Sequence, residues 1–208
     1  MVHEVEAKFR LGALPKMDDH CVRNEIRQGY LDFNDDEMIQ SEIENVFGGV
    51  DLSKIKEARI RAKGSGETTH YYFTLKSDGT LSRDEFEEEI GSDRFERLWP
   101  EAKMGRIAKI RSEIDLGDGL IAEVDQYGQN LEGLYTLEVE FDPEEFTLEQ
   151  IIERVQRLDS SAENVTELKE YKNARMAKRE SLTDLEEMVN LERGQMEQEL
   201  NEGRPPIR

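Results

Sequence analysis

The sequence predicts a β-dominated α+β fold, in which eight antiparallel strands close into a barrel with flanking helices and a C-terminal helical extension. Three observations lead to this prediction. Strand-like segments recur along the chain with apolar and charged residues in alternation. Short turns rich in Gly, Asp, Asn and Ser join several of them, which is typical of antiparallel neighbours. The charged sides are sorted by sign, and a closed barrel gives all of them one interior face.

The predicted strands follow the alternation of apolar and charged residues. In the first, at 2–10, apolar residues alternate with Glu4, Glu6 and Lys8, so the three charged side chains share one face. Seven further segments repeat the pattern with other charges: 27–33, 58–63, 70–76, 83–90, 106–116, 120–127 and 135–141. Eight such strands are enough to close a barrel with one face inside.

Helical patterns are concentrated in the last third of the chain. A capping box opens at Thr147, ahead of apolar residues at helical spacing. Thr166 is a candidate cap for a second helix that reaches Ala177, and a third helix lies within 182–200. The segment 32–57 fits either a short helix or an extra strand. Four aromatic residues are expected to pack in the barrel rather than to contact a ligand: Tyr30, Phe73, Phe86 and Phe141.

The charge of the chain disfavours several classes of partner. The 208 residues include 28 Lys and Arg against 48 Asp and Glu, a formal net charge of −20. Such a chain is repelled by nucleic-acid phosphates and by anionic membranes, so we expect neither partner. No apolar run reaches the length of a membrane span, and no signal-peptide pattern is present. With a single cysteine, Cys21, we expect a cytoplasmic protein, either a monomer or a homodimer.

If the charged strand faces point inward, the interior holds both signs of charge. The acidic positions are Glu4, Glu6, Glu85, Glu87, Glu123, Asp125, Glu138 and Glu140. The basic positions are Lys8, Arg59, Arg61, Lys76, Lys109 and Arg111. Arg and Lys bind phosphate oxygens, whereas clustered carboxylates bind a divalent cation such as Mg²⁺ or Mn²⁺. Together they predict a metal-dependent site for a polyphosphate.

These motifs, taken in order, resemble the CYTH domain, also called the triphosphate tunnel metalloenzyme superfamily. The family signature Glu-x-Glu-x-Lys stands at 4–8 as Glu-Val-Glu-Ala-Lys. The later motifs are Gln28-Gly29-Tyr30-Leu31, Arg59-Ile60-Arg61, Thr74-Leu75-Lys76, Arg83-Asp84-Glu85-Phe86-Glu87, Lys109-Ile110-Arg111, Glu123-Val124-Asp125, Leu137-Glu138-Val139-Glu140-Phe141 and Tyr171-Lys172-Asn173. A lone Glu-x-Glu-x-Lys arises by chance in charged chains, but the ordered set is specific. The resemblance covers 2–178.

The resemblance implies a triphosphate tunnel domain at 1–178, followed by an acidic helical extension at 179–208. It also implies metal-dependent hydrolysis of inorganic tripolyphosphate, with nucleoside triphosphates as further substrates. By family position the six basic residues hold the phosphates. The metal shell comes mostly from Glu4, Glu6, Glu138 and Glu140. Four further acids complete it directly, through water, or by pairing with the bases: Glu85, Glu87, Glu123 and Asp125. Glu4, Glu6 and Lys8 are the expected catalytic residues.

Three alternative functions stay open. A class IV adenylate cyclase uses the same chamber to make cyclic AMP from ATP, but no aromatic-rich loop clearly provides a seat for the base and ribose. A thiamine triphosphatase needs an aromatic platform, and Trp99 is poorly placed for that role. A non-catalytic module that binds polyphosphate has no need of eight carboxylates.

Overall fold

The computed structural model describes residues 5–17, 21–65, 68–77 and 85–201. Its strands are β1 (Val5–Leu11), β2 (Arg23–Leu31), β3 (Ile55–Gly64), β4 (His70–Ser77), β5 (Glu85–Ile90), β6 (Arg106–Gly117), β7 (Leu120–Tyr127), β8 (Tyr135–Phe141) and β9 (Glu163–Asn164). Its helices are α1 (Glu37–Phe47), α2 (Ser92–Leu98), α3 (Leu148–Leu158), α4 (Asn173–Met176) and α5 (Leu182–Asn201). Short 3-10 turns are η1 (Leu52–Lys54), η2 (Trp99–Glu101), η3 (Gln129–Leu131) and η4 (Lys169–Tyr171).

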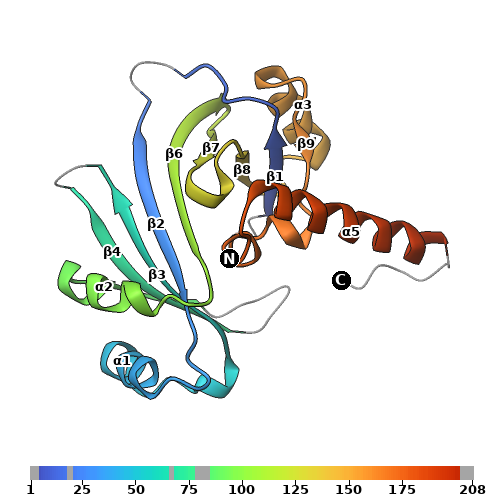
Figure 1. Cartoon of the computed structure of the whole chain (residues 1–208). Helices are drawn as coiled ribbons and strands as arrows, with labels where there is room; N and C mark the ends of the chain where they lie inside the picture. Colours follow the sequence, from blue (N-terminus) through green and yellow to red (C-terminus); the bar gives the residue numbers. More distant parts are fainter. Residues whose placement is uncertain (1–4, 18–20, 66–67, 78–84, 202–208) are drawn as a thin grey trace.

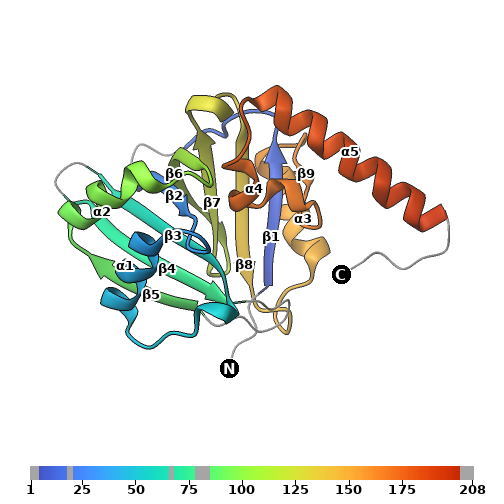
Figure 2. The ribbon, with the colours of Figure 1, turned by 60° about the horizontal axis from the view of Figure 1, so that its bottom comes forward.

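The described strands form one curved antiparallel sheet in the order β5-β4-β3-β2-β6-β7-β8-β1-β9 (Figures 1 and 2). The prediction of an eight-stranded closed barrel is therefore wrong in two respects. All eight predicted strands are present, but β9 adds a ninth by pairing with Phe9 and Arg10 of β1. Because β8 and β9 occupy the two edges of β1 there, β1 offers no free edge to β5 at those residues. Within the part of the chain that the structure describes, the sheet ends at β5 and β9 and does not close.

The alternation within the strands separates a charged face from an apolar face. On β3, Ile60 packs with Ile39 of α1 and Phe95 of α2, on the face opposite Arg59 and Arg61. Figure 2 shows α1 and α2 together on one side of β3 and β4. A second apolar cluster forms where α3 covers β1, β7 and β8. The hydrophobic core therefore lies between the sheet and these helices, which leaves the charged face to line the interior.

Two of the helices outside the sheet begin at clear capping residues. The side chain of Thr147 accepts a hydrogen bond from the backbone N–H of Gln150, and the Gln150 side chain accepts one from the N–H of Thr147, so the predicted capping box of α3 is confirmed. In the ambiguous segment 32–57 the structure has α1. Its cap is Asp36, whose carboxylate accepts from the backbone N–H groups of the first turn.

The chain after β9 departs from the helix predicted to begin at Thr166. The Thr166 hydroxyl accepts from the backbone N–H of Lys8 at 3.0 Å and donates to the Asn164 side chain at 2.7 Å. It therefore ties this segment to β1 instead of capping a helix, and the span predicted as helix, up to Ala177, holds only η4 and α4. The predicted third helix is confirmed as α5, which packs Leu185 against Tyr171 in a third apolar cluster. Of the described helices, none is long and apolar enough to cross a membrane.

Candidate active site

The charged face of the sheet lines a cavity of about 590 Å³. Every described candidate residue lines it except Asp125: Glu6, Lys8, Arg59, Arg61, Lys76, Glu85, Glu87, Lys109, Arg111, Glu123, Glu138 and Glu140. Asp125 is fully buried and contacts two of the lining bases. Glu4 lies outside the described residues. The alternation along β1 and along β3 to β8 therefore gathers the predicted charges in one chamber.

Asp125 of β7 is the centre of an ion-pair network on one side of the cavity. Its carboxylate accepts from Lys109 Nζ at 2.5 Å, and it binds Arg111 in a bidentate manner, from Nε at 2.7 Å and from Nη2 at 2.6 Å. Burial lowers the pKa of Lys109 even though the charge of Asp125 opposes that shift. Burial also acts to lower the pKa of Arg111, but the surrounding carboxylates outweigh it and raise that pKa. Both cations are thus held at fixed positions on the wall.

Glu138 of β8 links Lys8 to the same network. Its Oε1 lies 2.7 Å from Lys8 Nζ, and its Oε2 lies 2.7 Å from Arg111 Nη2. Glu123 forms a further ion pair with Arg111. Burial acts to raise the pKa of Glu138, but the positive charges of Lys8, Lys109 and Arg111 hold this pKa well below its usual range. Glu138 is therefore ionised at neutral pH.

A second, looser network joins β3, β4 and β5. Lys76 Nζ lies 2.9 Å from Glu85, and Arg61 Nη2 lies 3.2 Å from Glu87. Among the described residues, the carboxylate oxygens paired with Arg59 lie 3.7 Å away, on Glu85 and Glu87. Burial, followed by the charge of Arg59, lowers the pKa of Arg61. Arg59 and Arg61 together therefore form a concentrated positive charge that is only partly neutralised.

Two carboxylates face each other where β1 pairs with β8. The sheet register places Glu6 opposite Glu140 and Lys8 opposite Glu138. Burial, then the charge of Glu138, raises the pKa of Glu6, and Glu140 adds to the shift. Carboxylates are the hard oxygen ligands that Mg²⁺ and Mn²⁺ prefer, so the donor chemistry fits a divalent cation. Within the described residues, no three His, Cys, Asp or Glu side chains are grouped as a metal site, and the expected ligand Glu4 lies outside them.

The cavity wall also includes strand residues that were not assigned from the sequence. Glu57 continues the alternation of Arg59 and Arg61 by one step on β3, so the period of two was a sufficient signal for it. Gln28 and Tyr30 follow the same period on β2. Tyr30 packs in the third apolar cluster, as expected, but it also lines the cavity and accepts a hydrogen bond from Gln28. Burial raises the pKa of its hydroxyl, which stays protonated.

Apart from Ile26 of β2, the remaining wall comes from the segment after β9. It contributes Thr166, Leu168, Tyr171, Lys172, Asn173 and Ala174. The Tyr127 hydroxyl of β7 donates to Asn173 at 3.2 Å and joins this segment to the sheet. Lys172 adds a cation to the wall. Local periodicity does not reveal these positions, because a tertiary contact between the segment and the sheet places them.

Comparison with known proteins adds two kinds of similarity. No family model matches the chain. The chain is 34% identical over 174 residues to the inorganic triphosphatase of Nitrosomonas europaea, and the match spans 84% of this chain and 96% of that relative. A crystal structure of an inorganic triphosphatase is similar with a TM-score of 0.56 and 31% identity, over 86% of this chain and 96% of the other. A second crystal structure, of a hypothetical protein, is similar with a TM-score of 0.55 and 30% identity, over 84% of this chain and 97% of the other.

Proposed function

The chain belongs to the triphosphate tunnel metalloenzyme (CYTH) family, and on this premise we propose that it hydrolyses a triphosphate inside the charged cavity. Inorganic tripolyphosphate is the proposed substrate, and nucleoside triphosphates are further candidates. One observation carries the proposal: the same cavity wall presents a row of cations and an opposed pair of carboxylates. A linear polyanion needs the cations, and a divalent metal needs the carboxylates.

Six basic residues are proposed to hold the phosphate oxygens: Lys8, Arg59, Arg61, Lys76, Lys109 and Arg111. Each of them has a carboxylate partner, so binding replaces or supplements that partner with phosphate oxygens. The exchange is easiest at Arg59, whose carboxylate contacts are long, and hardest at Arg111, which Asp125 holds in a bidentate pair. We therefore expect Arg59 to follow the substrate and Arg111 to stay fixed.

Glu4, Glu6, Glu138 and Glu140 are the proposed metal ligands, and Mg²⁺ or Mn²⁺ is the proposed ion. When bound, such an ion offsets phosphate charge and lowers the pKa of a coordinated water. The other acids in the cavity, Glu85, Glu87, Glu123 and Asp125, are proposed to balance the bases, as their ion pairs indicate.

Glu6 and Lys8 are the described members of the proposed catalytic set. Glu6 is proposed to take a proton from the attacking water, because its carboxylate lies at the proposed metal site. In the metal-free chain its pKa is raised, first by burial and then by the charge of Glu138. Lys8 lies one step along the same face of β1 and is proposed to stabilise negative charge on the phosphate in the transition state. We place both functions in a domain at 1–178 and treat 179–208 as an extension of it.

The proposal is tested by measuring phosphate release from tripolyphosphate, ATP and thiamine triphosphate with Mg²⁺ or Mn²⁺, with cyclic AMP measured in parallel. The wild-type chain is expected to hydrolyse tripolyphosphate, and the double variant Glu4→Gln with Glu6→Gln is expected to lose this activity. Glu88→Gln is a matched control, because Glu88 is exposed on β5 and alternates with the cavity residue Glu87. Tripolyphosphate binding without turnover would instead favour a non-catalytic module, and cyclic AMP would favour a cyclase.

A further inference from the structure

We propose that Glu192 of α5 is a positioning residue, which fixes one wall of the substrate cavity from outside. The wall is the segment 168–174, and Glu192 itself does not line the cavity. The inference rests on the proposed function only where it concerns substrate affinity and turnover. Its structural part stands on contacts between α5 and this segment.

The Glu192 carboxylate binds two consecutive backbone N–H groups. Its Oε1 accepts from Lys169 at 2.9 Å, and its Oε2 accepts from Glu170 at 3.0 Å. These amides open the turn η4, whose N-cap residue, Leu168, makes no side-chain capping bond within the described chain. The first N–H groups of a helical turn lack partners inside the turn, and a carboxylate satisfies them with charge-assisted bonds. Glu192 therefore caps η4 from a position more than 20 residues further along the chain.

The turn that Glu192 caps carries cavity-lining side chains on both sides of the two amides. Leu168 precedes them, and Tyr171 and Lys172 follow them. The Tyr171 side chain is buried against Leu185 of α5, so the same helix also fixes this residue through apolar contact. The backbone conformation at 169–170 consequently sets where the Tyr171 ring and the Lys172 ammonium meet the cavity.

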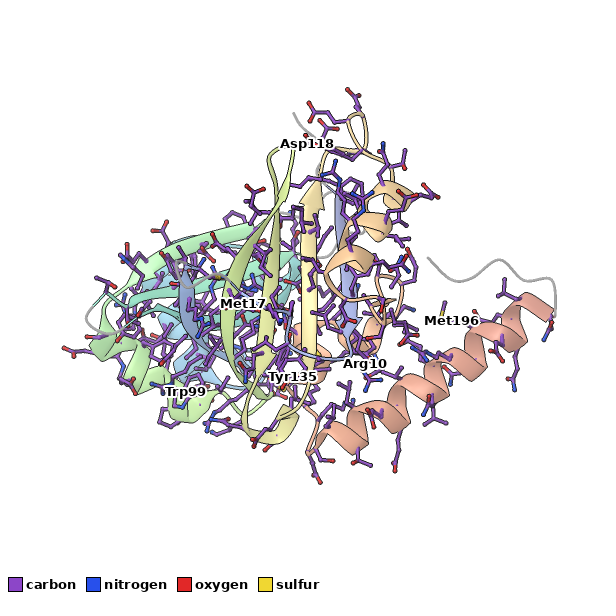
Figure 3. The ribbon with its side chains drawn as sticks, turned by 90° about the horizontal axis from the view of Figure 1, so that it is seen from above. Arg10, Met17, Trp99, Asp118, Tyr135 and Met196 are labelled. Carbon is purple, nitrogen blue, oxygen red and sulfur yellow. The ribbon has the colours of Figure 1, made fainter. Side chains whose placement is uncertain are left out.

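The helix that carries Glu192 is itself anchored to the edge of the sheet. Arg10 of β1 lies 2.5 Å from Glu186, and Glu163 of β9 pairs with Arg193. Arg10 and Glu163 lie opposite each other in the pairing of β1 with β9, so both ion pairs to α5 start from the same position on the sheet. Figure 3 shows Arg10 beside α5. Arg10 is two residues from Lys8 on β1, and this connects the outer helix to a strand that also lines the cavity.

The polar contact can be separated from the packing of the helix. Leu185 and Val189 anchor α5 by apolar burial. We expect a change at Glu192 to leave this packing intact. Glu192→Gln keeps the size of the side chain but leaves one carbonyl acceptor for two N–H donors. We expect the amides of Lys169 and Glu170 to exchange hydrogen about tenfold faster, since a lost hydrogen bond to a charged group is worth roughly that factor in an equilibrium.

The experiment compares Glu192→Gln with Glu197→Gln, an exposed position on the same helix, in the full chain. For Glu192→Gln we expect KM for tripolyphosphate, and its Kd by calorimetry in EDTA, where hydrolysis does not proceed, to rise about fivefold. We expect kcat to stay within about twofold and the thermal midpoint within about 2 °C of wild type. Glu197→Gln is expected to match wild type in every measurement.

Unchanged amide exchange in Glu192→Gln would overturn the capping contact. Faster exchange with unchanged KM and Kd would overturn the positioning role, and so would a fall in kcat alone. A wild-type chain that binds tripolyphosphate without hydrolysing it would refute the proposed function, while amide exchange and Kd would still decide this inference.

Discussion

Glu6 of β1 lies directly opposite Glu140 of β8 in the antiparallel sheet. Like charges in this position destabilise a strand pair. Burial and the charge of Glu138, with a further contribution from Glu140, raise the pKa of Glu6 accordingly. The fold thus maintains an unfavourable pair of charges at the place where we propose a metal ion. The proposed metal site accounts for this pairing.

Replacing Glu6 by Gln is expected to stabilise the metal-free protein at neutral pH. The pKa of Glu6 in the folded chain lies above its ordinary value of 4.5, so the folded state holds this proton more tightly than the unfolded state. Ionisation of Glu6 therefore lowers stability as pH rises through the folded pKa, and Gln removes that loss. In EDTA at pH 7 we expect the thermal midpoint to rise by roughly 2 °C, and the difference to vanish at low pH.

Addition of Mg²⁺ or Mn²⁺ is expected to reverse the order of the two thermal midpoints, so that the wild-type chain becomes more stable than Glu6→Gln. Either ion raises the thermal midpoint of the wild-type chain by mass action, whereas Glu6→Gln gains much less. Glu88→Gln, on the outward side of β5, is the matched control and is expected to respond as the wild type does. An equal metal response in Glu6→Gln would contradict the assignment of Glu6 as a ligand.

Truncation of Glu138 is expected to be strongly destabilising. Its two oxygens hold Lys8 and Arg111, so Glu138→Ala leaves a buried ammonium without its carboxylate. Removing one member of a buried ion pair lowers the free energy of unfolding by about 3–5 kcal/mol. Because the pKa of Glu138 is held low, this contribution is present at neutral pH and fades as pH falls below 4.5 toward the folded value.

Urea unfolding at pH 7 and at acid pH measures this effect. The double variant Lys8→Met with Glu138→Leu is expected to recover part of the loss, because it leaves no unpaired charge on that pair. A destabilisation by Glu138→Ala below about 1 kcal/mol would place the pair among weak surface contacts and contradict its burial.

The strand period explains why so much of the site was predictable from sequence. Once a segment is a strand, alternation alone decides that Lys109 and Arg111 share a face, and the same holds on every long strand. The pattern does not tell which acid meets which base across strands. It therefore grouped Asp125 with the lining carboxylates, although Asp125 is buried behind Lys109 and Arg111.

Long-range contacts explain the errors. With only two residues, β9 has no detectable period, yet it occupies the edge of β1 that barrel closure would have needed at Phe9 and Arg10. Thr166 is of a residue type that often caps helices, but its hydroxyl forms a hydrogen bond with the backbone of Lys8, which is distant in sequence. Such partners are set by tertiary packing, which local propensity does not encode.

Glu87→Gln is expected to separate the two kinds of acid in the cavity. Glu87 accepts from Arg61 and from the Thr74 hydroxyl, the latter at 2.7 Å, and we assign it to charge balance. Its loss leaves Arg59 and Arg61 less neutralised, so tripolyphosphate is expected to bind about threefold more tightly at low ionic strength, with the gain screened by salt. Steady-state KM at two salt concentrations measures this. The metal response of the thermal midpoint should stay intact, and its loss would make Glu87 a metal ligand instead.

Asp125 and Glu123 allow the most direct comparison, because they are two acids on one strand that contact the same Arg111. The Asp125 side chain is fully buried and also holds Lys109, while the Glu123 side chain is 35% exposed. Asp125→Asn is expected to destabilise the chain by about 3 kcal/mol, since two buried cations lose their shared charge partner. It should also lower kcat/KM more than tenfold, because both cations are proposed to hold phosphate. Glu123→Gln is expected to change stability by less than about 1 kcal/mol. Urea unfolding and steady-state kinetics on the two variants measure the difference, and equal losses would mean that the buried pair has no special role in fixing the cations.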